Sequence, residues 1–274
     1  MKEATIQDGK VADFLHNVRN AAFSVLLLDF DGTLAPFSLN RSRVLPYDGV
    51  REVLQEIVDT GRTRLIIVTG RDGREIGPLL GLHPSPEVWG VHGLQRVRPD
   101  GMCEMLEIPS SVKEALDAAR HWLAYQDLGS LEETKPGAIA VHWRGLSEAE
   151  AFELRSRILL GWSPIADRGQ LELLEFDGGI EVRMRGPNKG DAVKTILDEA
   201  GRHVPVAYLG DDLTDENAFR ALGDHGFTAL VRPEPRPTLA QLWITAPGGL
   251  LKFLQGWAEA TETELSSSNI AISR

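Results

Sequence analysis

Cysteine is almost absent, since Cys103 is the single cysteine in a chain of 274 residues. One thiol cannot form a disulfide framework within the chain, and it cannot build a zinc site from several thiolates. No His or Asn stands beside Cys103 in a pattern typical of a nucleophile. We therefore expect Cys103 to be a small buried or half-buried residue.

Positive charge and long apolar runs are also scarce. The chain has 29 Lys and Arg residues against 40 Asp and Glu residues, a net charge of −11. This balance argues against nucleic acid or an anionic membrane surface as the partner. The longest apolar run, around residues 25–28, is far too short to cross a bilayer, and the polar segment 1–10 lacks the apolar region of a signal peptide. We expect a cytoplasmic protein that needs a cation wherever it binds phosphate.

The pattern of apolar residues predicts an α/β fold. The runs at 24–30 and 65–68 lack alternation, which is typical of strands buried on both faces, and residues 47–60 between them have helical spacing. Strand, helix and strand in this order predict a βαβ unit and a Rossmann-like parallel sheet. The same rhythm resumes in a helix at 191–200 and strands at 204–209 and 228–231.

The middle of the chain has a different texture and predicts an inserted α+β module. Strand-like segments and amphipathic helices follow one another there, with turn signals that fit hairpins. The strands are expected at 138–143, 171–176 and 180–183, the helices at 112–124 and 147–160, and the turns at 99–101 and 177–179. We divide the chain into a core at 1–95 and 185–260, an inserted module at 96–184, and an unstructured polar tail at 261–274.

Acidic side chains follow the first predicted strand directly. In an open α/β sheet, the carboxyl ends of the strands form the edge where ligands bind. Asp29 and Asp31 lie two positions apart on extended backbone, so they point the same way. One carboxylate could attack an electrophile while the other moves protons. The alternative is an Asp-Gly turn whose acids are only solvated. An apolar strand that leads directly into this pattern favours a catalytic role.

Later strand ends carry further polar residues. Four acids occupy six positions at 211–216. A helix N-cap explains Asp215 or Glu216, but the adjacent Asp211 and Asp212 repel each other unless a cation such as Mg²⁺ binds them. Lys189, at a helix start, could supply a second positive charge for phosphate. Thr69 follows the second strand, a position where Thr is also common without a functional role.

In order along the chain, these residues resemble the four motifs of the haloacid dehalogenase-like superfamily over about residues 24–257. The motifs are Asp29 with Asp31, then Thr69, then Lys189, then Asp211-Asp212-x-x-Asp215. Dehalogenases lack the second Asp of the first motif, so the resemblance implies phosphoryl transfer. The inserted module looks like the superfamily's large cap of the second type.

A narrower resemblance is to the trehalose-6-phosphate phosphatase family. Residues 28–36 (LDFDGTLAP) are close to its first motif, and residues 210–219 (GDDLTDENAF) contain its specific form Thr-Asp-Glu-x-x-Phe. Segments 90–93, 133–135, 142–144 and 181–183 look like its cap and flanking elements. Thr69 stands where Ser is commoner and Pro136 follows Lys135, and neither departure removes a functional group.

The resemblance implies hydrolysis of trehalose 6-phosphate through an aspartyl-phosphate intermediate. Asp29 would be the nucleophile and Asp31 the general acid and base, with Lys189 and Thr69 on the phosphoryl oxygens. Mg²⁺ would be held by Asp29, the Asp31 backbone carbonyl and Asp211, while Asp212 and Asp215 steady its waters or complete its shell. The expected substrate-binding residues are Thr69, Gly70, Arg71, His92, Glu133, Lys135, His142, Arg144 and Glu181.

Two alternatives stay open beside this interpretation. The substrate could be another sugar phosphate, namely sucrose 6-phosphate or mannosyl-3-phosphoglycerate, although the Thr214-Asp215-Glu216 form argues against it. The chain could also be a non-catalytic sugar-phosphate sensor, which the intact acidic residues and Lys189 argue against. Association with a trehalose-6-phosphate synthase is compatible with the resemblance and is not visible in the sequence.

Overall fold

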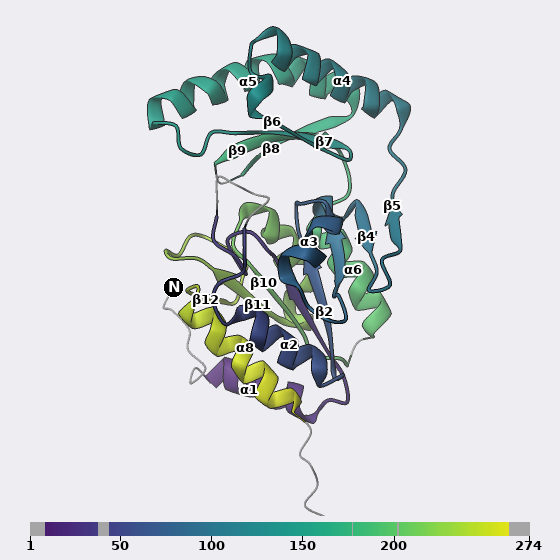
Figure 1. Ribbon diagram of the computed structural model, residues 1–274, viewed down its shortest axis with the longest axis vertical. Helices are drawn as coiled ribbons and strands as arrows, with labels where there is room; N and C mark the ends of the chain where they lie inside the picture. The colour runs from purple at the N-terminus through teal and green to yellow at the C-terminus, as the bar shows by residue number, and fades with distance from the viewer. Residues whose placement is uncertain (1–8, 38–43, 177, 202, 263–274) are drawn as a thin grey trace, which may run out of the picture.

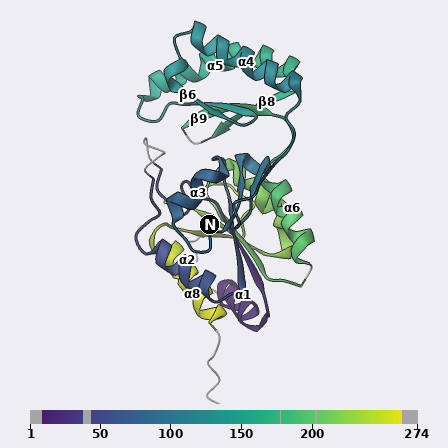
Figure 2. The same ribbon diagram turned by 45° about the vertical axis from the view of Figure 1, so that its right-hand side comes forward.

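The computed structural model describes residues 9–37, 44–176, 178–201 and 203–262. These residues form two sheets, one of eight strands in the order β12-β11-β10-β1-β2-β3-β4-β5 and one of four in the order β6-β7-β9-β8. Figures 1 and 2 show the smaller sheet above the larger one, with α4 and α5 on its far face.

Most of the larger sheet is parallel, as the sequence predicts. Its parallel strands are β12 (Leu242–Ile244), β11 (Phe227–Val231), β10 (Val206–Gly210), β1 (Ser24–Leu28), β2 (Thr63–Val68) and β3 (Glu87–Gly90). Two antiparallel strands, β4 (Gln95–Val97) and β5 (Cys103–Met105), extend the edge beyond β3. The α/β fold with a mainly parallel sheet is therefore confirmed.

Helices cover both faces of the larger sheet, which explains the apolar runs without alternation. Leu26 and Leu28 of β1 pack into one core cluster, whereas Val25 and Leu27 pack into another on the opposite face. The first cluster contains residues of α1 (Gly9–Asn20), α2 (Val50–Asp59), α3 (Gly73–Leu80) and α8 (Gly248–Thr261). The second contains residues of α6 (Lys189–Ala200) and α7 (Glu216–Leu222).

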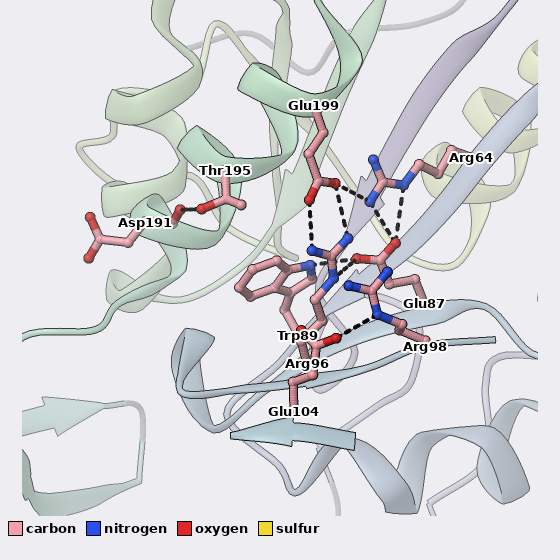
Figure 3. A network of polar contacts seen from close by, with 9 residues as sticks. All are labelled: Arg64, Glu87, Trp89, Arg96, Arg98, Glu104, Asp191, Thr195 and Glu199. Atoms are coloured by element: carbon pink, nitrogen blue, oxygen red, sulfur yellow. Dashed lines mark hydrogen bonds and ion pairs between the residues drawn. The ribbon is translucent and has the colours of Figure 1, made fainter. Parts of the chain in front are cut away.

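A network of ion pairs fixes α6 against the sheet (Figure 3). Glu199 of α6 accepts from Arg64 at 2.6 Å and from Arg96 at 2.7 Å. Both arginines also donate to Glu87, which is 6% exposed. Because α6 begins at Lys189, this network helps to place that lysine beside the carboxyl ends of the strands.

The smaller part is an antiparallel sheet packed under two helices, as predicted for the inserted module. Its strands are β6 (Glu132–Lys135), β7 (Ala138–His142), β8 (Leu171–Phe176) and β9 (Gly179–Met184), and its helices are α4 (Ser110–Tyr125) and α5 (Glu148–Gly169). A separate core cluster holds it together, with Trp162 of α5 fully buried against the sheet. The helix α5 runs past the predicted end at residue 160, and Pro164 lies within it.

The sequence-based boundary at residue 96 falls inside the larger sheet. The predicted hairpin around residues 99–101 does form, but its strands β4 and β5 pair with β3 and not with the smaller sheet. Residues up to Met105 therefore belong with the larger sheet, and the smaller part begins with α4 at Ser110. For the predicted hairpin at 177–179, β8 and β9 pair as expected, although residue 177 lies outside the described residues.

Two smaller expectations also change. Thr261, assigned to the tail, is the last residue of α8 and is 1% exposed, and its buried hydroxyl is satisfied by the carbonyls of Trp257 and Ala258. The remainder of the predicted tail, from residue 263 on, lies outside the described residues. Cys103 is exposed and not buried. Among the described helices, none is long and apolar enough to cross a membrane.

Candidate active site

Three strand ends of the larger sheet meet at one cavity. Asp29 and Asp31 follow β1, Thr69 follows β2, and Asp211 follows β10. Asp29, Thr69 and Asp211 line this cavity and are at most 4% exposed, so the cavity floor that they form is buried. The parallel pairing of β1 with β2 and with β10 brings these side chains together, as the sequence predicts.

Lys189 is the cation at the centre of this arrangement. Its Nζ donates to Asp29 Oδ1 at 2.7 Å and to Asp215 Oδ1 at 2.7 Å, and the residue is 2% exposed. Asn188 caps the start of α6, since its side chain accepts from the Gly190 backbone N–H. Burial alone would lower the pKa of Lys189, but the two carboxylates outweigh burial and raise this pKa. The ammonium therefore stays charged.

Asp215 serves as a fixed acceptor below the cavity. Its Oδ1 accepts from Lys189 and from the Tyr208 hydroxyl at 2.6 Å, and its Oδ2 accepts from the backbone N–H groups of Asp211 at 3.0 Å and Asp212 at 2.9 Å. The residue is 0% exposed and does not line the cavity. With both oxygens occupied, Asp215 holds Lys189 and the turn at Asp211 in position.

The acids of the site are suited to a cation. Carboxylate oxygens of Asp29, Asp211 and Asp215 lie within 4.8 Å of one another. Neither oxygen of Asp211 has a hydrogen-bond partner among the described residues, and both are buried. Burial and the nearby Asp29 raise the pKa of Asp211, and burial raises the pKa of Asp29 to about 7 although Lys189 opposes it. Buried acceptors without donors are rare in native proteins, so a positive charge beside Asp211 would satisfy them.

Arg71 contacts Asp31 and not the cavity. Its Nε and one terminal nitrogen each donate to an Asp31 carboxylate oxygen at 2.6 Å. The Arg71 side chain is 1% exposed and does not line the cavity, whereas Asp31 does. The structure therefore places Arg71 behind Asp31, where its fork-shaped guanidinium fixes that carboxylate, in contrast to the substrate contact expected from the sequence.

The smaller part supplies the opposite wall of the same cavity. Lys135, His142, Arg144 and Glu181 all line it. Lys135 Nζ donates to Glu181 Oε2 at 2.8 Å, and Glu181 is 1% exposed. Burial alone would raise the pKa of Glu181, but Lys135 and other nearby basic side chains together outweigh burial and lower it to about 2. Glu133 lies behind this wall, with its Oε2 2.6 Å from His142 Nε2.

His92 connects the two walls. It lines the cavity beside Gly70, and its Nε2 lies 3.5 Å from Glu181 Oε1. Burial lowers the pKa of His92 well below its usual value, although Glu181 opposes this effect. His92 is therefore neutral at physiological pH, and its position links the Thr69 loop with the smaller sheet.

Most of the residues expected from the sequence thus reach one cavity, and three do not. Asp29, Asp31, Thr69, Gly70, His92, Lys135, His142, Arg144, Glu181, Lys189, Asp211 and Asp212 line it. Arg71, Glu133 and Asp215 lie behind it. Sequence reasoning missed four lining residues, Phe37, Leu174, Phe176 and Thr214. Thr214 sits inside a recognised motif, and Leu174 and Phe176 alternate along a predicted strand, whereas Phe37 carries no such signal.

Comparison with known proteins identifies the family. The family model described as trehalose-phosphatase matches residues 27–241. The trehalose-6-phosphate phosphatase of Escherichia coli is 30% identical over 203 residues, which cover 72% of this chain and 73% of that protein. The bifunctional trehalose-6-phosphate synthase/phosphatase of Thermoproteus tenax is 30% identical over 232 residues, but the match spans 84% of this chain and only 31% of that longer protein.

Solved structures agree at the level of the fold. The C-terminal domain of the C. albicans trehalose-6-phosphate phosphatase superposes with a TM-score of 0.80 at 21% identity, covering 94% of this chain and 99% of that one. A haloacid dehalogenase-like hydrolase from B. subtilis superposes with a TM-score of 0.58 at 16% identity, covering 89% and 100%. With the matched sequence running from β1 to the edge of β12, this chain belongs to the trehalose-phosphatase family of phosphoric monoester hydrolases, on a haloacid dehalogenase-like fold.

Proposed function

We propose that this protein hydrolyses trehalose 6-phosphate to trehalose and phosphate, with Asp29 as nucleophile and Mg²⁺ as cofactor. The observation that carries the proposal is one cavity with two unlike walls. The larger sheet contributes carboxylates and a buried ammonium, which suit phosphoryl transfer. The smaller sheet contributes Lys135, Glu181 and other hydrogen-bonding groups, which suit sugar hydroxyls. Family membership supports the same reaction and the same substrate.

The cation would be held by Asp29, the Asp31 backbone carbonyl and Asp211. The two unpartnered oxygens of Asp211 fit this role, and hard oxygen donors suit Mg²⁺. Asp212 lines the cavity and could hold waters of the cation, whereas Asp215 already accepts four hydrogen bonds and acts by positioning. When bound, Mg²⁺ would offset the charge of the phosphate dianion that this acidic site otherwise repels.

In the first step a carboxylate oxygen of Asp29 attacks phosphorus while the bond from phosphorus to the sugar oxygen breaks. Asp31 gives a proton to the departing oxygen, and trehalose leaves. Lys189, 2.7 Å from Asp29, and Thr69 would hold the other phosphoryl oxygens. In the second step water attacks phosphorus, Asp31 takes its proton, and the bond to Asp29 breaks to release phosphate. Positioning and charge neutralisation supply most of the acceleration in such transfers.

The Arg71 pair adds a condition to this mechanism. Both oxygens of Asp31 accept hydrogen bonds from Arg71 in the structure, so Asp31 is held as a carboxylate. A nearby guanidinium favours the charged form of a carboxyl group, although each oxygen keeps a second lone pair that can take a proton. The pair with Arg71 therefore opposes the protonation that Asp31 needs before it can protonate the sugar oxygen.

A phosphate-release assay over a panel of substrates tests the proposal. The panel contains trehalose 6-phosphate, sucrose 6-phosphate, mannosyl-3-phosphoglycerate and a generic aryl phosphate. We expect the highest kcat/KM with trehalose 6-phosphate. A higher kcat/KM with another sugar phosphate would identify that compound as the substrate. If the folded protein released phosphate from none of them, the result would favour a non-catalytic sensor.

A substitution in the smaller part separates recognition from chemistry. Glu133→Ala removes the partner of His142 and should cost about tenfold to a hundredfold in kcat/KM for trehalose 6-phosphate. The loss should be much smaller with the aryl phosphate, which has no second sugar. Glu153→Ala, on the exposed side of α5, is the matched control. Equal losses on both substrates would show that Glu133 supports the fold or the chemistry in general.

Two further proposals concern a protein partner and the location in the cell. The fusion of a synthase to the T. tenax relative supports association of this chain with a separate synthase, which co-purification would test. The cytoplasmic location expected from the sequence would be tested by cell fractionation.

A further inference from the structure

The cavity is too small for the substrate in this conformation. It encloses about 80 Å³, whereas cavities that hold drug-sized ligands measure about 300–1,000 Å³. A disaccharide phosphate belongs to the larger class. The smaller part must therefore move away from the larger sheet to admit the sugar, and the contacts across the cavity mouth oppose that movement.

One such contact is a cation–π pair between the two parts. The Arg144 guanidinium, from the turn after β7, lies 4.3 Å from the centroid of the Phe37 ring, in the segment after β1. Both residues line the cavity. Phe37 is 40% exposed, so its ring is not anchored in the core of the larger part. Arg144 contacts this ring from the smaller part.

Glycines on both sides make room for this pair. Gly32 has a φ of +83°, and a Cβ there would lie 2.6 Å from Phe37 Cζ. Gly178 has a φ of +86°, and a Cβ there would collide with the Arg144 side chain. Each member of the pair therefore packs closely onto the backbone of its own part.

A second pair of residues, His92 and Glu181, faces across the cavity without forming an ion pair. His92 and Glu181 also face each other from the two parts, but 3.5 Å separates His92 Nε2 from Glu181 Oε1. His92 is neutral at physiological pH, because burial lowers its pKa. Little charge attraction therefore acts between these two side chains.

We propose that Phe37 is a positioning residue that holds Arg144 and so keeps the smaller part closed over the cavity when no substrate is bound. Substrate entry requires the pair to separate, and re-formation of the contact returns Arg144 to the cavity wall. A cation–π contact shifts such an equilibrium by about two- to thirtyfold. The consequence for substrate entry rests on the proposed function, whereas the effect on closure does not.

Distances between spin labels test closure directly. The native Cys103 is exposed on β5 of the larger sheet, and Leu160 on α5 of the smaller part is 82% exposed. The Leu160→Cys protein therefore accepts one label on each part, and pulsed electron resonance gives the distance distribution without substrate. In Phe37→Leu we expect the ratio of open to closed protein to rise about two- to thirtyfold. Phe152→Leu, at a residue of α5 that is 68% exposed, is the matched control and should change nothing.

A double-mutant cycle identifies the pair as the cause. Arg144→Met keeps the aliphatic stem and removes the charge, and it should open the protein as much as Phe37→Leu does. The double variant should open no further than either single variant. Unchanged distances in Phe37→Leu, or additive shifts in the double variant, would overturn the proposal.

The same variants separate this inference from the proposed function. Phe37→Leu should raise the rate of trehalose 6-phosphate association by a similar factor, because the substrate enters only the open form. An unchanged association rate in a variant that does open would overturn the link between this contact and substrate entry. If the wild type releases no phosphate from any substrate, the proposed function fails, while the distance measurements still decide whether Phe37 controls closure.

Discussion

Replacing Lys135 with Met should destabilise the protein more than any exposed charge change. Lys135 Nζ lies 2.8 Å from Glu181 Oε2, and the two side chains are 7% and 1% exposed. Met fills a similar volume but removes the positive charge. The Glu181 carboxylate would then remain buried without its cation.

Two considerations give the magnitude of this effect. The pKa of Glu181 falls from the usual 4.5 to about 2, because Lys135 and other nearby basic side chains together outweigh the opposing effect of burial. That change corresponds to about 3 kcal/mol of free energy of unfolding at neutral pH. Breaking a buried ion pair by removing one partner costs about 3–5 kcal/mol in other proteins. We therefore expect Lys135→Met to lower the free energy of unfolding by about 3 kcal/mol at pH 7.

The pH dependence of this difference has a definite sign. Because the folded pKa of Glu181 is lowered, its stabilising contribution is present above pH 4.5 and is lost as the pH falls through about 2. In Lys135→Met, burial is no longer opposed by Lys135 and raises the pKa of Glu181. As the pH falls, protonation of Glu181 removes the buried charge that destabilises the variant. The difference in free energy of unfolding between wild type and variant should therefore narrow on acidification.

Urea unfolding at pH 7 and at pH 4.5 measures this gap. Lys113→Met, which removes an exposed lysine of α4, is the matched control and should change the free energy of unfolding little. Adding Glu181→Gln to Lys135→Met should recover part of the loss, because no charge then remains buried. A gap below about 1 kcal/mol at pH 7, or one that widens on acidification, would refute the reasoning.

Three further predictions concern the chemistry. Asp29→Asn should fold normally, as judged by circular dichroism, and lose turnover by orders of magnitude, because the amide cannot attack phosphorus; near-normal phosphate release would contradict the mechanism. Excess chelator should abolish activity and Mg²⁺ restore it. Burial raises the pKa of Asp29 to about 7 despite Lys189, and it also raises the pKa of Asp211. The apparent affinity for Mg²⁺ should therefore rise at least about tenfold per pH unit between pH 5 and 7, and a pH-independent affinity by titration calorimetry would exclude this proton release. Tyr208→Phe removes a 2.6 Å hydrogen bond to the buried Asp215, so we expect a loss of about 1–3 kcal/mol in the free energy of unfolding and a lower kcat with little change in KM on both sugar and aryl phosphates. Tyr125→Phe, at a residue that is 85% exposed, is its control, and equal behaviour of the two variants would count against a role for Tyr208.

The sequence alone was sufficient to predict the parallel sheet and the residues at its carboxyl edge. Apolar runs, helical spacing and turn residues are local signals, and they located β1, β2 and β10 to within two residues. Once these strands are parallel, Asp29, Thr69 and Asp211 must lie at one edge, whatever the details of packing.

Short strands escaped this reasoning because their assignment depends on their partners. The strands β4 and β5 have three residues each, and β5 is exposed along its length. Such segments carry no burial pattern, so their pairing with β3 follows only from the folded arrangement. Local signals therefore assigned the hairpin to the inserted module, whereas in the structure it extends the larger sheet.

Tertiary structure alone decided what each polar residue of the site contacts. Lys189 and Asp29 are 160 positions apart, and Arg71 reaches Asp31 across 40 positions. Motif spacing cannot show that Arg71 turns to Asp31, or that Asp215 receives four donors and is thereby withdrawn from the cavity. These roles depend on side-chain direction and on burial, which exist only when distant segments pack together.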